Sequence, residues 1–153
     1  MMALANDIDR LLHIDVFRNL SRDLLGVLAL AAQTKMIRPG HEAFRAGELA
    51  NGGYLILSGT LAVRFPLGFP QGNREGYLGP GSFLGEYALL TPTVWEVTLY
   101  AHTPVTLMHI PRKDFLRLIT AHPETIPPIR EILGKKLQNF IAACKDVLAS
   151  DLA

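Results

Sequence analysis

The sequence has 153 residues, of which 49% are hydrophobic, and its 15 basic and 14 acidic side chains give a net charge of +1. This length fits one domain with a real core, and the hydrophobic content argues against intrinsic disorder. The balanced charge argues against a polyanion such as DNA as the main partner. The single cysteine, Cys144, excludes an internal disulfide framework and fits a reducing compartment.

The N-terminal segment lacks the features of a secretory signal. The stretch MMALANDIDRLLHIDVF has charges at Asp7, Asp9 and Arg10 in place of a basic start followed by an apolar run. No apolar run in the chain approaches the roughly 20 residues that a membrane helix needs. We therefore expect a cytoplasmic chain with no membrane partner.

The first part of the single domain expected over residues 1–153 is helical. Apolar residues at helical spacing predict helices over residues 7–32, interrupted by a turn near Phe17–Ser21. Ser21 followed by Asp23 is the pattern of an N-cap with an acidic first turn, so a second helix is expected to begin there.

A small antiparallel β-barrel is expected over residues 35–111. Glycine or proline marks a turn about every eight to twelve residues, a rhythm typical of sandwiches and barrels. GYLILSGTLAVRF has the apolar alternation of two strands joined at Ser58–Gly59, and VTLYA and VTLMHIP are two further β-branched runs. PLGFPQGNREG is expected to be a loop because it is rich in proline and glycine.

Helices are expected again over residues 112–150, and the last of them is long. Its apolar positions follow one another in steps of three and four, close to a coiled-coil seam. These positions are Ile126, Ile129, Leu133, Leu137, Phe140, Cys144 and Val147. Since a small domain covers only part of such a stripe, we expect a homodimer through this helix.

The stretch LGPGSFLGEYALLTPTVWEVTLYA, residues 78–101, contains the candidate site. Glycines precede a carboxylate, Glu86, and a short apolar turn. The run GPGSFLG is not a dinucleotide-binding fingerprint, because three residues rather than two precede its last glycine and predicted strands surround it.

The order of helices, barrel and long helix, together with these motifs, resembles the cyclic nucleotide-binding domain of the catabolite-activator and protein-kinase-A regulatory type. The resemblance covers residues 12–148. RPGHEAFRAGE is similar to the family's first strand pair, GYLILSGTLAV to its strand-turn-strand, LGPGSFLGEYALL to the start of its phosphate-binding cassette, and MHIPRKDFLRLITAHPE to its last strand and exit helices. The resemblance implies a mainly β fold with flanking helices and a long C-terminal helix. The β part would be an antiparallel β-barrel of the double-stranded β-helix or jelly-roll type.

The resemblance also implies ligand-binding residues in the cassette. In the family, backbone N–H groups of a short helix face the cyclic phosphate. The matching positions here are Gly85, Glu86, Tyr87, Ala88 and Leu89. Glu86 would accept a hydrogen bond from the ribose 2′-hydroxyl, and amides around Gly85 and Ala88 would meet the phosphate. Glu86 has a second interpretation, in which it caps the short helix without any ligand.

The second half of the cassette departs from the family pattern. An alignment without gaps places Val94, Trp95 and Glu96 where the family usually has proline, arginine and a small hydroxyl residue. Trp95 lacks the charge that arginine offers a phosphate, and Glu96 adds a like charge, so the affinity should fall by about a thousandfold. Trp95 is interpreted as a pocket-filling aromatic residue or a stacking surface, Glu96 as a solvated residue or a selector of a cationic or neutral ligand. Arg64 or Arg74 could supply a compensating cation.

These features predict a sensory or regulatory domain rather than an enzyme. No serine, histidine and carboxylate arrangement and no pair of acids suggests catalysis. The histidines, His13, His41, His102, His109 and His122, show no spacing that predicts a metal site. No cofactor is certain, and cyclic AMP, cyclic GMP or another small molecule is the possible effector.

We expect weak or altered nucleotide binding, with the signal passing through the C-terminal helix to a possible effector protein. One alternative is a ligand-free dimerisation or interaction module on the same scaffold. Another is a true cyclic AMP or cyclic GMP receptor with a compensating cation. Because no helix-turn-helix pattern follows before Ala153, direct nucleic-acid binding is not expected.

Overall fold

Antiparallel sheets and the helices beside them make up the computed structural model of the chain, which describes residues 2–64 and 76–138. In these residues one sheet has the strand order β1-β10-β4-β7, a second has the order β2-β9-β5-β6, and β3 pairs with β8. Every pairing is antiparallel. The strands are β1 (Gln33–Ile37), β2 (Glu42–Phe44), β3 (Leu49–Ala50), β4 (Gly52–Ser58), β5 (Leu61–Arg64), β6 (Gly76–Leu78), β7 (Phe83–Leu84), β8 (Thr93–Val94), β9 (Thr98–Ala101) and β10 (Val105–Pro111).

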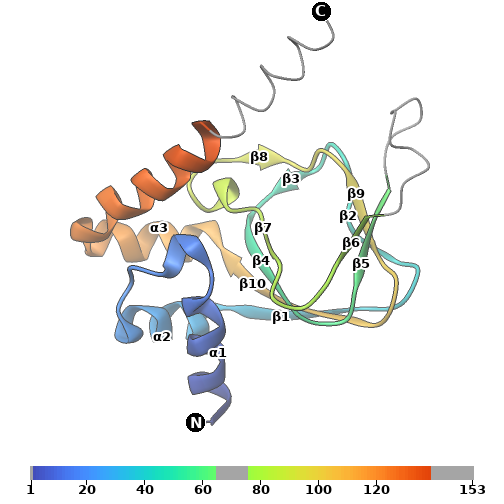
Figure 1. Ribbon diagram of the computed structural model, residues 1–153, viewed down its shortest axis with the longest axis horizontal. Helices are drawn as coiled ribbons and strands as arrows, with labels where there is room; N and C mark the ends of the chain where they lie inside the picture. The colour runs from blue at the N-terminus through green and yellow to red at the C-terminus, as the bar shows by residue number, and fades with distance from the viewer. Residues whose placement is uncertain (1, 65–75, 139–153) are drawn as a thin grey trace, which may run out of the picture.

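The helices gather on one side of the strands (Figure 1). They are α1 (Met2–Leu12), η1 (Asp15–Phe17), α2 (Arg22–Ala31), α3 (Arg112–Ala121), η3 (Pro123–Thr125) and a C-terminal helix described over residues 126–138, while η2 (Tyr87–Leu89) lies within the cassette. The prediction of a mainly antiparallel β fold with flanking helices and a C-terminal helix is therefore confirmed. Ser21 does cap α2, because its hydroxyl oxygen accepts a hydrogen bond from the Leu24 N–H at 3.3 Å. The first helix begins at Met2 rather than near residue 7.

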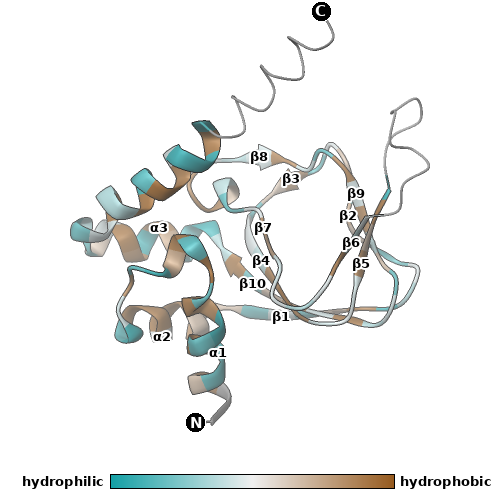
Figure 2. Cartoon of the chain, viewed as in Figure 1, coloured by the Kyte–Doolittle hydropathy of each residue, from teal (hydrophilic) through white to brown (hydrophobic). Residues whose placement is uncertain are grey.

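The hydrophobic core has two parts, separated by β4. Leu55 belongs to a helix-side cluster, which includes Phe17, Leu25 and Phe115, whereas Tyr54 and Ile56 belong to a barrel-side cluster. Successive side chains of a strand point to opposite faces, so a strand buried between two layers has no polar face. Figure 2 shows hydrophobic residues gathered on α2 and β10, where the helices meet the barrel.

Two connections of the sheet position the residues discussed below. β10 lies between β1 and β4, so His109 is registered with Gln33 on one side and Tyr54 on the other, and the strand runs directly into α3. β7 pairs with the start of β4 and leads into Gly85 and η2.

Some predictions concern residues that the structure does not describe. Arg74, Cys144 and most of the loop over residues 66–76 lie outside the described residues, as do Phe140 and Val147 of the apolar stripe. The predicted homodimer and the extent of the single domain therefore stay predictions. Within the described ranges, no helix has the length and apolar character needed to cross a bilayer.

Candidate ligand cassette

Gly85 allows the chain to turn tightly from β7 into η2. Its φ of 79° lies in the left-handed region, and a Cβ atom there would come within 2.5 Å of the Gly52 carbonyl oxygen. Only glycine fits such a close approach between backbones without a shift of the chain. This contact seats η2 against β4.

The first turn of the cassette uses part of its backbone hydrogen-bonding capacity internally. The Ala88 N–H donates to the Gly85 carbonyl at 3.0 Å, and the Leu89 N–H donates to the Glu86 carbonyl at 3.3 Å. Within the described part of the chain, the N–H of Glu86 has no such partner. The Glu86 side chain makes no capping hydrogen bond to η2, so the interpretation of this residue as a simple helix cap is wrong.

Trp95 is held in place by both its backbone and its ring. Its N–H donates to the Glu48 carbonyl at 2.9 Å, and its carbonyl accepts from the Gly47 N–H at 2.7 Å. The ring stacks on Phe44 with centroids 4.1 Å apart and packs against the barrel-side cluster near Tyr54. Trp95 is therefore a half-buried filler of the barrel mouth.

A cavity of about 420 Å³ opens between the cassette and the end of the barrel. It is lined by Ala50, Phe83, Leu84, Gly85, Glu86, Tyr87, Ala88, Thr93, Val94, Trp95, Glu96 and Lys136. Six of the seven residues predicted from the sequence thus surround one space. Leu89 does not line this space, because its side chain is completely buried in the helix-side cluster.

Of the two arginines considered from the sequence, Arg64 does not line this cavity. Arg64 forms an ion pair with Glu42 at 3.4 Å and lies over the Tyr100 ring at 4.9 Å. Arg74 lies outside the described residues. Glu96 lines the cavity and is exposed to solvent.

Lys136 is the cation that lines the cavity among the described residues, and the sequence did not predict it. It comes from the C-terminal helix, and its Nζ donates to both carboxylate oxygens of Glu86, at 2.9 and 2.8 Å. It also forms an ion pair with Asp15 of η1 at 3.3 Å. Burial alone would lower the pKa of Lys136, but its hydrogen bonds and charge interactions with Glu86 and Asp15 outweigh burial and raise that pKa.

A second polar contact joins the same two elements. The Tyr87 hydroxyl donates to the Leu133 carbonyl at 3.4 Å, one turn before Lys136 on the C-terminal helix. Ile129 and Leu133 of that helix are buried in the helix-side cluster. The cassette and the C-terminal helix are therefore joined by apolar packing, a hydroxyl bond and a charged bond.

The described residues contain no cluster of three or more histidine, cysteine, aspartate or glutamate side chains arranged to hold a metal ion. The charged side chains that line the cavity are Glu86, Glu96 and Lys136, and Trp95 lines it as well.

Comparisons with known proteins agree with this geometry. The family model described as a cyclic nucleotide-binding domain matches residues 34–122, more than half of the chain. The chain belongs to the cyclic nucleotide-binding domain family.

Its relatives carry this domain within longer proteins. The chain is 28% identical to a cyclic nucleotide-gated potassium channel of Mesorhizobium japonicum over 80% of its own length and 31% of the channel. It is 29% identical to glutaminase 2 of Bradyrhizobium diazoefficiens over 81% of its length and 19% of the relative. It therefore spans less than a third of each of these two proteins.

Solved structures show the same architecture. A cyclic nucleotide-binding-like protein from Brucella abortus is 29% identical with a TM-score of 0.66, over 75% of this chain and 98% of that one. The catabolite activator protein of Thermus thermophilus is 25% identical with a TM-score of 0.69, over 89% of this chain and 63% of that one. The similarity to these structures supports the assignment of the chain to a class of regulatory domains.

Proposed function

We propose that the chain is a regulatory domain whose cassette binds a small effector, with nucleotide affinity weaker than the family pattern would give, and that the signal leaves through the C-terminal helix. The observation that carries this proposal is the bond from Lys136 to both oxygens of Glu86. In the structure, the chain's own cation occupies the carboxylate that the family resemblance assigns to a ribose hydroxyl.

The bond couples effector binding to the position of the helix. An effector that needs Glu86 must take over at least one of its oxygens, which weakens the hold of Lys136 on the cassette. An effector shifts a conformational equilibrium only by its difference in affinity between the two states. Competition for one carboxylate supplies such a difference, and the coupling is reciprocal between effector and helix.

The wall of the cavity explains why affinity for a cyclic nucleotide should be low. Trp95 offers a ring face where the family pattern has a guanidinium, and Glu96 brings a negative charge toward the place of a phosphate. A neutral or cationic flat molecule would avoid the repulsion and keep the stacking surface. Such molecules are the altered effectors that this cavity favours.

A second candidate function rests on the same lysine. Lys136 lines the cavity with 35% of its side chain exposed, so its ammonium can swing from Glu86 to a phosphate. The chain would then be a true cyclic AMP or cyclic GMP receptor in which Lys136 replaces the missing arginine. The two functions assign Lys136 opposite effects on nucleotide affinity.

Calorimetric titration of cyclic AMP and cyclic GMP into the wild type and Lys136→Met separates the two functions. If Lys136 blocks Glu86, the substitution raises affinity by about tenfold, since it removes an internal competitor. If Lys136 grips the phosphate, the substitution lowers affinity by a similar factor. Lys135→Met is the matched control, because Lys135 is exposed and forms only a long ion pair with Glu131, at 3.9 Å.

A third outcome would overturn both functions. If neither nucleotide gives heat with the wild type or with Lys136→Met, and flat cationic or neutral purine analogues give none either, the cassette is not an effector site. The interpretation as a ligand-free interaction module would then account for the fold. The predicted homodimer is tested separately, by sedimentation of the full chain.

A further inference from the structure

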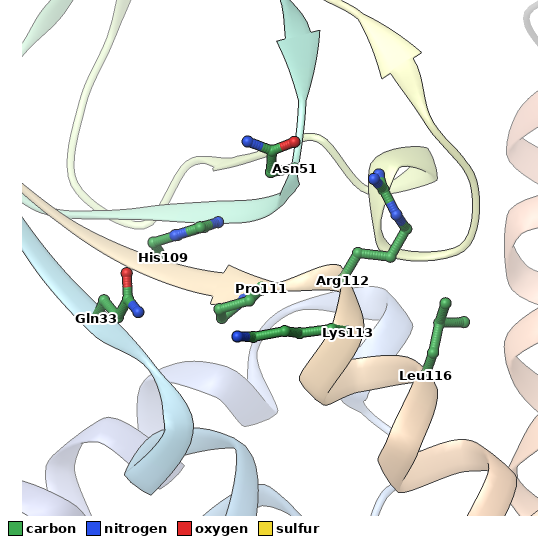
Figure 3. A pocket seen from close by; sticks show the side chains of 7 residues that line it. All are labelled: Gln33, Asn51, His109, Pro111, Arg112, Lys113 and Leu116. Atoms are coloured by element: carbon green, nitrogen blue, oxygen red, sulfur yellow. The ribbon is translucent and has the colours of Figure 1, made fainter.

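A second cavity lies at the junction of β10 with α3. Its volume is about 450 Å³. It is lined by Gln33, Asn51, His109, Pro111, Arg112, Lys113 and Leu116 (Figure 3). Its residues come from β1, β10, the start of α3 and the link between β3 and β4, and none of them lines the cassette cavity.

His109 is the unusual residue of this cavity. Only 8% of the residue is exposed, and neither ring nitrogen has a hydrogen-bond partner within the described residues. Figure 3 shows the imidazole projecting from β10 toward the side on which Asn51 lies. Buried polar groups are normally satisfied, so an imidazole with two unpartnered nitrogens is an exception that marks the wall of this cavity.

The surroundings of His109 determine its protonation state. Burial lowers the pKa of His109, the Lys35 ammonium lowers it further, and Asp114 opposes them. The ring is therefore neutral near pH 7, with one nitrogen as donor and the other as acceptor. It stacks flat on Tyr54, at 4.3 Å between centroids and 5° between planes, which fixes its orientation.

The charged side chains around the cavity favour a ligand with one negative charge. Lys113 is exposed, and Figure 3 shows its ammonium extending alongside Pro111 toward the side of Gln33. Arg112 has one nitrogen committed to the carbonyls of Ala50 and Ala88, at 3.0 and 3.1 Å, so it is partly satisfied. Asp114 follows Lys113 on the same helix and would repel a dianion.

The remaining walls suit an apolar body with polar atoms at its edge. Pro111 is buried and Leu116 half-buried, and together they offer an apolar surface. The amides of Gln33 and Asn51 can each donate or accept a hydrogen bond at the rim. From these features we propose that this cavity is a second small-molecule site and that it binds a small monocarboxylate with an apolar body, its charge on Lys113 and its body against Pro111 and Leu116.

Benzoate is the probe for this site, and the ring resonances of His109 are the readout. The full chain is labelled with ¹⁵N, and His109→Phe, which keeps a ring on Tyr54, assigns the signals. Benzoate is expected to give a saturable shift in the millimolar range, as fits so small a probe. Benzamide, which has the same shape without the charge, should bind about tenfold more weakly.

Two substitutions on α3 locate the charge contact. Lys113→Gln should weaken benzoate about tenfold. Arg117→Gln removes the same charge one turn further along the helix, outside this cavity, and should leave benzoate binding unchanged. Lys136→Met should also leave it unchanged, so the result does not depend on the cassette proposal.

Three results would overturn the proposal. The first is no saturable shift of the His109 ring with benzoate. The second is equal weakening by Lys113→Gln and Arg117→Gln, which would indicate diffuse attraction to a basic surface. The third is tighter binding of inorganic phosphate than of benzoate, because the site would then select charge density rather than a carboxylate on an apolar body.

Discussion

The floor and the wall of the cassette cavity are built by different means. The floor, from Gly85 to Ala88, is set by backbone geometry, because Gly85 turns in a left-handed conformation against the Gly52 carbonyl. The wall is set by side chains, namely Trp95 stacked on Phe44 and Lys136 arriving from the C-terminal helix. A position with the backbone geometry of Gly85 accepts few residue types. In contrast, a single substitution can change the charge of the wall. The shape of the cavity therefore depends mainly on the backbone of the floor, and its charge depends on the side chains of the wall.

The largest effect on stability is expected at the floor. Gly85→Ala should destabilise the chain by about 3 kcal/mol, because it adds left-handed strain and a clash with the Gly52 carbonyl. Gly81→Ala is the matched control, since Gly81 has a similar φ of 91° but open space where the Cβ would lie. It should cost only about 1 kcal/mol. Urea unfolding of both variants measures the difference, and equal losses would mean that the Gly85 contact does not fix the floor.

The largest effect on affinity is expected at the wall. Replacing Trp95 by arginine and Glu96 by serine together should raise cyclic AMP affinity by about a thousandfold, since a charged contact is gained and a repulsion removed. Calorimetric titration measures the gain. Glu96→Ser alone should recover only about tenfold. If the double variant folds and binds no better than the wild type, the wall does not limit affinity.

The sequence predicted the floor and missed part of the wall for a physical reason. Gly85, Glu86 and Ala88 are neighbours in the chain, so their spacing encodes the turn that they make. The position of Trp95 in the cassette could also be predicted, because the alignment with the family pattern continues from Gly85 to Trp95 without a gap. Lys136 lies 50 residues beyond Glu86, and no local pattern tells which flank of a helix meets a distant turn. In the sequence, Lys136 is one of several polar residues that lie between the apolar positions of its helix.

The same limit applies to the barrel interior. The alternation of apolar residues predicted the strands, but it did not predict that β4 is buried on both faces. Whether a strand is buried on one face or on both depends on the distant elements that cover it. His109 had no motif that distinguished it from the other histidines. Only the register of β10 between β1 and β4 places it beside Tyr54 and Gln33.

A smaller effect separates the two partners of Lys136. A double-mutant cycle between Lys136→Met and Glu86→Gln should give a coupling of about 1 kcal/mol, since the Glu86 side chain is only 19% exposed and accepts with both oxygens. The cycle with Asp15→Asn should give about half as much or less, because Asp15 is more exposed and its ion pair is longer. Urea unfolding provides the free energies. A larger coupling to Asp15 would make Lys136 a tether of η1 rather than of the cassette.

The smallest effect concerns His109, at the far end of a row of rings that begins with Trp95 and continues through Phe44 and Tyr54. The folded-state pKa of His109 is lowered, by burial first and by Lys35 second, so the unfolded chain binds more protons as the pH falls below about 6.5. The stability that the neutral ring contributes is therefore complete above that pH and is lost as the pH falls toward the folded-state pKa.

We expect the free energy of unfolding to drop by up to about 1 kcal/mol between pH 7.5 and pH 5.5 because of this one residue. His109→Phe should remove that part of the slope, whereas His41→Phe, at an exposed histidine, should keep it. Urea unfolding of the three proteins at both pH values measures the slopes. A slope that survives in His109→Phe would show that the protons bind elsewhere in the chain and that His109 does not cause the loss of stability.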